Sequence, residues 1–192
     1  MDQSDKDAIY FIGAVVVVCF AVQLVNVVLN GYLLDYGLLP RHLNHAIGLF
    51  AYPFIHGSWA HLFSNMVSFS ALAYLVSRSG VARLISVFMI SWAVSGVGVW
   101  LFGRMHYHIG LSGIVYGLWA YLLVYAVLRR SLKSMAIALI VMFFYGPMLT
   151  GIIPAHSWIS YESHLSGALA GVMAGYVFAR RDKAKAVANV EQ

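Results

Sequence analysis

The chain has 192 residues, of which 61% are hydrophobic and 10% are charged, and its mean hydropathy is +0.80. This composition excludes an ordinary soluble globular domain and indicates a protein of the lipid bilayer. The formal net charge of +5 does not indicate nucleic acid as a partner. Most of the basic residues follow apolar segments, where they mark the cytoplasmic side of a membrane.

Six apolar segments without Asp, Glu, Lys or Arg follow one another along the chain, and each is predicted to be a transmembrane helix. They are residues 9–29, 59–77, 84–102, 112–128, 134–153 and 164–179. Basic residues gather at the amino terminus and after the second, fourth and sixth segments, so both termini are expected to be cytoplasmic. The predicted fold class is all-α, a polytopic bundle of six transmembrane helices.

The parts outside the six segments are short, with one exception. Residues 1–8 are expected to form a short cytoplasmic N-terminus, residues 9–180 a single six-helix core, and residues 181–192 a polar cytoplasmic tail. The exception is residues 30–58, which are apolar but broken by glycine and proline. We expect this first outer loop to lie in the outer membrane interface as short amphipathic helical pieces.

Three polar residues at the outer ends of predicted helices lie at matching distances from the inner surface. His61, Ser112 and His164 precede the arginines that follow their helices by 17, 17 and 16 residues. At about 1.5 Å per residue these separations are about 24 to 26 Å, against a hydrocarbon core of about 30 Å. The three side chains are therefore expected at a common depth, some distance below the outer surface.

A hydroxyl and imidazoles at one depth favour nucleophilic catalysis, because serine needs a base to accept its proton. Ser112 is the expected nucleophile. Donors for an oxyanion are expected from His61, from Asn65 one turn later, and from the backbone N–H groups at the start of the helix that begins at Ser112. Tyr116, one turn after Ser112, is expected to stack on His164 and hold its ring.

Small residues repeat every four positions on two of the predicted helices, and we expect those helices to pack closely there. The residues are Gly113 and Gly117 on one helix, and Gly167 and Gly171 on the other.

A metal centre is the main chemical alternative, because the outer loops are rich in histidine. The chain has no His-Glu-x-x-His motif, and the only acidic residues expected outside are Asp35 and Glu162. We therefore expect no catalytic metal and read His106 and His108 as interfacial loop histidines. Glu162 lies two residues before His164, so on a helix it points away from that ring, and a Ser-His pair is favoured over a triad.

Three motifs resemble those of the rhomboid intramembrane serine proteases. "GLSGIVYG" (110–117) resembles the family's Gly-x-Ser-Gly and implies Ser112 as nucleophile, and "HLSGALAG" (164–171) implies His164 as the base. "HGSWAHLFSN" (56–65) resembles the signature of the second helix, which implies oxyanion stabilisation by His61 and Asn65. His56 and Gly110 are expected in supporting roles.

The resemblance covers residues 9–180 and implies cleavage of transmembrane protein substrates near their outer ends, in contact with membrane lipid and without a cofactor or metal. It also implies a cap near residues 154–163 and lateral substrate entry. One departure is that no Trp-Arg pair precedes His56, where many members of the family carry one.

Two alternatives stay open within this resemblance. Some rhomboid-like proteins are silent binders of transmembrane clients, although such relatives usually lack the serine or the histidine. A rhombosortase-like enzyme, which trims C-terminal anchors, fits the sequence as well as a general rhomboid does. The expected location is a bacterial inner membrane, with the site opening outward.

Overall fold

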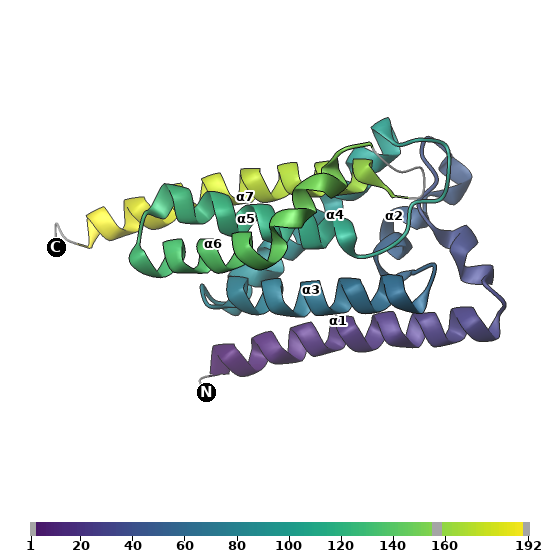
Figure 1. Cartoon of the computed structure of the whole chain (residues 1–192), viewed down its shortest axis with the longest axis horizontal. Coiled ribbons are helices and arrows are strands. Elements are labelled where there is room, and N and C mark those ends of the chain that lie inside the picture. The colour runs from purple at the N-terminus through teal and green to yellow at the C-terminus, as the bar shows by residue number, and fades with distance from the viewer. Residues whose placement is uncertain (1–2, 155–158, 190–192) are drawn as a thin grey trace.

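The computed structural model describes residues 3–154 and 159–189, and this part of the chain folds into a bundle of helices with short 3-10 segments in its loops. The longest helices run along one axis, so that α1 begins and α7 ends at one end of the bundle (Figure 1). The loop that holds α2 lies at the opposite end. The helices are α1 (Gln3–Val28), α2 (Gly48–Ala51), α3 (Trp59–Ser77), α4 (Val81–Phe102), α5 (Ser112–Arg129), α6 (Leu132–Tyr145) and α7 (Tyr161–Ala188).

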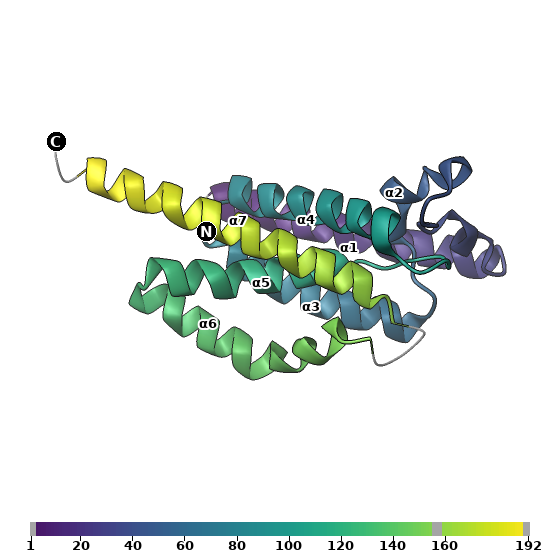
Figure 2. The same cartoon turned by 90° about the horizontal axis from the view of Figure 1, so that it is seen from above.

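Helix α5 is the centre of the bundle. Eleven of its 18 residues are buried, including the continuous run from Gly113 to Leu122. It packs on α7, α6, α4 and α3, and the view from above places it among these helices (Figure 2). Because the buried run begins directly after Ser112, this first residue of α5 is held in a fixed position.

Glycines bring α5 and α7 into direct backbone contact. A Cβ atom on Gly167 would overlap the carbonyl oxygen of Gly113, and one on Gly171 would overlap that of Gly117. A Cβ atom on Gly113 would also overlap Ser95 of α4, and one on Gly117 would overlap Ser91 of α4, so the same glycines let α4 approach as well. The predicted close approach of the two helices is therefore present, and it fixes the separation of the elements that carry Ser112 and His164.

The first outer loop consists of η1 (Tyr32–Tyr36), η2 (Leu43–His45), α2 and η3 (Tyr52–Phe54). Two contacts fasten it to α4: the buried Tyr52 hydroxyl donates to the carbonyl oxygen of Trp92 at 3.1 Å, and Trp92 Nε1 donates to Leu49 O at 3.0 Å. Arg41 donates to Leu101 O, in the last turn of α4, at 3.0 Å and to Gly103 O, just after this helix, at 2.9 Å. This arginine braces the loop without the Trp-Arg pair.

Two helix boundaries differ from the predicted ones. The predicted helix 134–153 is α-helical only to Tyr145 and then continues as the 3-10 segment η4 (Gly146–Ile152). Pro147 explains the change, because it has no N–H for an α-helical bond and its ring crowds the preceding turn. Helix α7 extends beyond residue 179 to Ala188, into the segment expected to be a polar tail.

An ion pair holds this extension of α7. Asp182 accepts hydrogen bonds from both terminal nitrogens of Arg83 on α4, at 2.9 to 3.1 Å, and from the Tyr125 hydroxyl of α5 at 2.7 Å. The three helices are therefore joined at the end of the bundle opposite to the outer loop.

Four helical stretches in the described residues are long and apolar enough to cross a membrane: Gln3–Val28, Val81–Phe102, Ser112–Arg129 and Leu132–Ile152. Helices α3 and α7 do not meet the same criterion. Their lower hydropathy follows from the polar residues that they carry toward the interior, such as Asn65 and His164.

Candidate active site

Ser112 and His164 are 52 residues apart in sequence and adjacent in space. Ser112 is the first residue of α5, and His164 lies in the first turn of α7. The Ser112 hydroxyl is 2.9 Å from His164 Nε2, and both residues are half-buried. This is the distance at which an imidazole can accept the proton of a serine.

Residues of η4 and α5 hold the His164 ring in its orientation. Nδ1 lies 2.9 Å from the carbonyl oxygen of Gly151, which can only accept, so Nδ1 carries the hydrogen and the lone pair is left on Nε2. The Tyr116 ring stacks on the imidazole with centroids 4.1 Å apart and planes at 12°. Tyr116 in turn donates its hydroxyl to Met148 O at 2.8 Å. His164 is thus fixed in the tautomer that a general base requires.

The side chains expected to hold an oxyanion line a cavity that Ser112 and His164 also line. Asn65 donates one amide hydrogen to the carbonyl oxygen of His61 at 3.0 Å, which leaves its second hydrogen for another acceptor. Gly110 has a φ of 104°, a conformation that glycine adopts readily. A Cβ atom there would come within 2.7 Å of the His61 ring. Gly110 therefore lets the chain pass directly over His61 before Ser112.

His56 contacts both the His61 ring and the backbone that leads to Ser112. Its ring lies edge-on to that of His61, with centroids 5.0 Å apart, and its Nε2 is 3.5 Å from the backbone nitrogen of Leu111. Burial, aided by the neighbouring His61, lowers the pKa of His56 to about 3. The imidazole is therefore neutral near pH 7 and can accept a hydrogen bond from the Leu111 N–H.

These residues line one cavity of about 890 Å³. Ser112, His164, His61, Asn65, Tyr116 and Gly151 all contribute to its wall. A volume in this range accommodates several side chains of a peptide. The arrangement supplies a nucleophile, a base and hydrogen-bond donors around one space, which are the requirements of acyl transfer.

A model of the family described as Rhomboid domain matches residues 43–181, which include every residue of this cavity wall. The chain belongs to the rhomboid family. The predicted resemblance is thereby confirmed, and this rhomboid is an integral membrane protein by its family and its apolar helices.

Its relatives carry little functional information. An uncharacterized protein of Mycobacterium tuberculosis is 33% identical over 178 residues, which cover 88% of this chain and 74% of that protein. An uncharacterized protein of Mycobacterium leprae is 33% identical over 140 residues, covering 68% and 55%. A protein of Acanthamoeba polyphaga mimivirus that is provisionally named a rhomboid protein is 30% identical over 125 residues, covering 62% and 67%.

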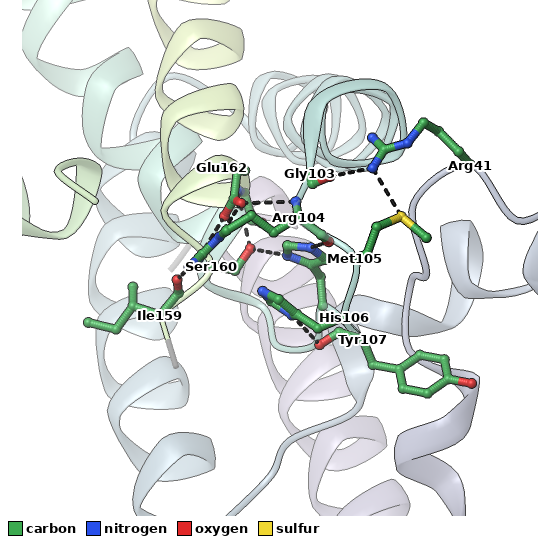
Figure 3. A network of polar contacts seen from close by, with 11 residues as sticks. Arg41, Gly103, Arg104, Met105, His106, Tyr107, Ile159, Ser160 and Glu162 are labelled. Atoms are coloured by element: carbon green, nitrogen blue, oxygen red, sulfur yellow. Dashed lines mark hydrogen bonds and ion pairs between the residues drawn. The ribbon is translucent and has the colours of Figure 1, made fainter. Parts of the chain in front are cut away.

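The structure of this rhomboid also contains polar residues that sequence reasoning did not place in the site. The Glu162 carboxylate pairs with Arg104 of the loop before α5, with Arg104 Nε donating to Oε1 at 2.6 Å (Figure 3). Arg104 also donates to Ile159 O at 2.6 Å. The loop before Ser112 is thereby tied to the segment before His164. One feature of the sequence indicates this pair: Arg104 and Glu162 are among the few charged residues in the segments expected on the outer side.

His108 adds a second tie between the same segments. Its Nδ1 lies 2.5 Å from the Ser160 hydroxyl and its Nε2 lies 3.0 Å from Arg104 O. Backbone bonds of 2.9 Å in each direction pair His108 with Leu38 of the outer loop. Burial lowers the pKa of His108 to about 4, so the ring is neutral near pH 7. Residues 155–158 of the predicted cap, which include His156, lie outside the described residues.

Proposed function

We propose that this rhomboid is an intramembrane serine endopeptidase that uses Ser112 and His164 as a catalytic dyad. The observation that carries the proposal is the 2.9 Å contact between Ser112 Oγ and His164 Nε2, with Nδ1 of the same ring on a carbonyl oxygen. A serine at a helix end has no structural need for a base with a fixed tautomer. A nucleophile does, and family membership supports this use of the pair.

The first chemical step is attack of Ser112 Oγ on a substrate carbonyl carbon. As the bond forms, His164 Nε2 takes the hydroxyl proton, and the imidazolium keeps its Nδ1–H on the Gly151 carbonyl. The carbonyl oxygen becomes an oxyanion. The free amide hydrogen of Asn65, the ring of His61 and the exposed N–H groups in the first turn of α5 are the donors in reach of the cavity.

The second step releases the amine and then the acid. The His164 imidazolium returns its proton to the leaving nitrogen, and an acyl group remains on Ser112. Water from the cavity then gives a proton to His164 and attacks the ester carbon. As the bond between that carbon and Ser112 Oγ breaks, His164 returns the proton to Oγ, which releases the acid and restores the serine. Glu162 takes no part in these transfers because its oxygens are bonded to Arg104.

We propose that six segments cross the membrane, namely the four candidate spans together with α3 and α7. Both termini are then cytoplasmic, and the Ser112 end of the bundle faces outward in a bacterial inner membrane. The substrate is the transmembrane segment of another protein. Because a carbonyl in an intact helix is shielded, its outer end must unwind, and substrates with helix-weakening residues there are expected.

Cleavage of a transmembrane reporter by purified enzyme in liposomes tests the proposal. We expect Ser112→Ala and His164→Ala each to abolish the cleavage product. Ser64→Ala is a matched control, because the Ser64 hydroxyl lies in the same cavity wall and bonds only the carbonyl of His61 among the described contacts. Full cleavage by either dyad variant would exclude the proposed mechanism.

A further inference from the structure

A second group of polar side chains lies beside the catalytic cavity, and its two histidines belong to the cavity wall. His106 and His108 come from the loop before α5, and Glu162 comes from the first turn of α7. One ligand atom from each of the three residues lies within 4.8 Å of the other two. Figure 3 shows His106 near Ser160, and the His108 ring contacts the Ser160 hydroxyl through Nδ1 at 2.5 Å. The three side chains converge from two separate elements.

Hydrogen bonds to backbone carbonyls fix which ring nitrogen of each histidine carries the lone pair. His108 Nε2 lies 3.0 Å from Arg104 O, so it carries the hydrogen, and the lone pair on Nδ1 accepts from the Ser160 hydroxyl at 2.5 Å, which a metal ion would displace. His106 Nδ1 lies 3.2 Å from Tyr107 O, so its lone pair is on Nε2. His106 Nε2 is buried and has no hydrogen-bond partner among the described residues.

An orphaned, buried acceptor needs an explanation, since such atoms are normally satisfied. The two rings stack with centroids 4.1 Å apart, so they do not satisfy one another through their edges. A metal ion satisfies the acceptor directly. Metal-binding histidines commonly donate their second ring N–H to a backbone carbonyl, and both of these rings are set up in that way.

Glu162 supplies the negative charge that a cation requires. Its carboxylate accepts from Arg104, at 2.6 Å on Oε1 and 3.1 Å on Oε2, yet each oxygen has a further lone pair. The side chain of Arg104 is 35% exposed, whereas that of Glu162 is 6% exposed. A cation therefore has to share the Glu162 carboxylate with Arg104, which also donates to Ile159 O at 2.6 Å. Because the positive charge of Arg104 competes with the cation for this carboxylate, we expect a moderate affinity for the metal ion.

We propose that His106, His108 and Glu162 bind a divalent transition-metal ion of the Zn²⁺ type, with water or the Ser160 hydroxyl completing the coordination. Two imidazole nitrogens and one carboxylate oxygen are ligands that Zn²⁺ takes in proteins. The ion is not a cofactor of the dyad. It joins the loop that leads to Ser112 with the start of α7.

The expected consequence is inhibition, and this part rests on the proposed function. His106, His108 and Ser160 line the same cavity as the dyad. An ion bound to the two histidines occupies part of that cavity wall and joins the loop before Ser112 to the start of α7. Because a substrate has to reach Ser112 within the same cavity, we expect the bound ion to slow cleavage.

Metal binding is tested first, by calorimetric titration of Zn²⁺ into the full chain in detergent micelles, after removal of any histidine tag and of metals. We expect one ion per chain. His106→Gln and Glu162→Gln are each expected to weaken binding by about tenfold or more, since even indirect supports of a metal site are worth about 10- to 100-fold. His42→Gln, which removes an exposed histidine of the outer loop, is the matched control and should bind as wild type does.

Absence of saturable binding, or equal weakening by His42→Gln, would overturn the site. Unfolding temperatures without metal show whether a variant is folded, so a misfolded variant is not taken as support. Inhibition is then measured on the reporter with saturating Zn²⁺ and with chelator. Reversible loss of cleavage in wild type but not in His106→Gln is expected, and unchanged cleavage with metal bound would overturn the inhibitory part. A chain that binds Zn²⁺ but cleaves nothing would contradict the proposed protease and leave the metal site standing.

Discussion

Gly151→Ala is expected to damage the active site while leaving the fold in place. The added Cβ would overlap the Tyr116 hydroxyl and lie 3.2 Å from His164 Nδ1, closer than side-chain carbons normally approach. Tyr116 then loses its bond to Met148 O, which costs about 1 kcal/mol of stability. The histidine ring must turn or shift away from Ser112.

The effect on catalysis is expected to exceed the effect on stability. A displacement of about 1 Å in a catalytic group can cost about 10²-fold in rate, which corresponds to about 2.7 kcal/mol of transition-state stabilisation. We therefore expect kcat/KM for the reporter to fall about 100-fold, while the unfolding temperature changes by only a few degrees for about 1 kcal/mol.

Gly146→Ala provides the matched control, because it makes the same change in the same segment. A Cβ on Gly146 meets only Met142 Cε at 3.9 Å, an ordinary contact. This variant should cleave as wild type does. If Gly151→Ala retains wild-type kcat/KM, then the position of η4 does not set the orientation of His164 and the reasoning is refuted.

Three further variants test the packing and the ion pairs, with unfolding temperature as the common measurement. Glu162→Gln should destabilise the protein by about 1–3 kcal/mol, less than a fully buried pair because its arginine partner is partly exposed; wild-type stability would show that the pair is dispensable. Asp182→Asn should lower stability but not the kcat of the folded enzyme, whereas Lys183→Gln at the exposed neighbouring position should change neither. Gly167→Ala should cost about 1–3 kcal/mol by forcing α7 away from α5, while Gly13→Ala, which meets nothing within 4 Å, should be neutral. A neutral Gly167→Ala would contradict the close packing.

The sequence placed Ser112 and His164 near one another because helix geometry is regular. Nearly equal residue counts to the inner arginines predicted a common depth, and glycine spacing predicted that their helices approach closely, while the choice of His164 over His61 as the base came from the resemblance to rhomboids. The structure brings the two side chains within 2.9 Å. The stacking of Tyr116 on His164 followed from the same regularity, since residues four apart lie on one helix face.

The contacts by which the loops support the site could not be predicted from the sequence. The carbonyl of Gly151 reaches His164 only because residues 146–152 leave the α-helical path, and hydropathy alone does not reveal where a helix tightens. Arg104 and Glu162 could be assigned to one side of the membrane, but 58 residues separate them and many loop paths were compatible with their positions. The extension of α7 was hidden for a similar reason, because Asp182 gains its partners only through tertiary contact.

Labelling of Ser112 by a fluorophosphonate, followed by mass spectrometry of the modified peptide, tests the central claim most directly. This measurement identifies the nucleophile and needs no known substrate. The account predicts an adduct on Ser112 in the wild-type chain and at most trace labelling in His164→Ala, because the serine loses its base. No adduct on wild-type Ser112, or equal labelling of the two chains, would contradict the dyad and favour a silent binder of transmembrane clients.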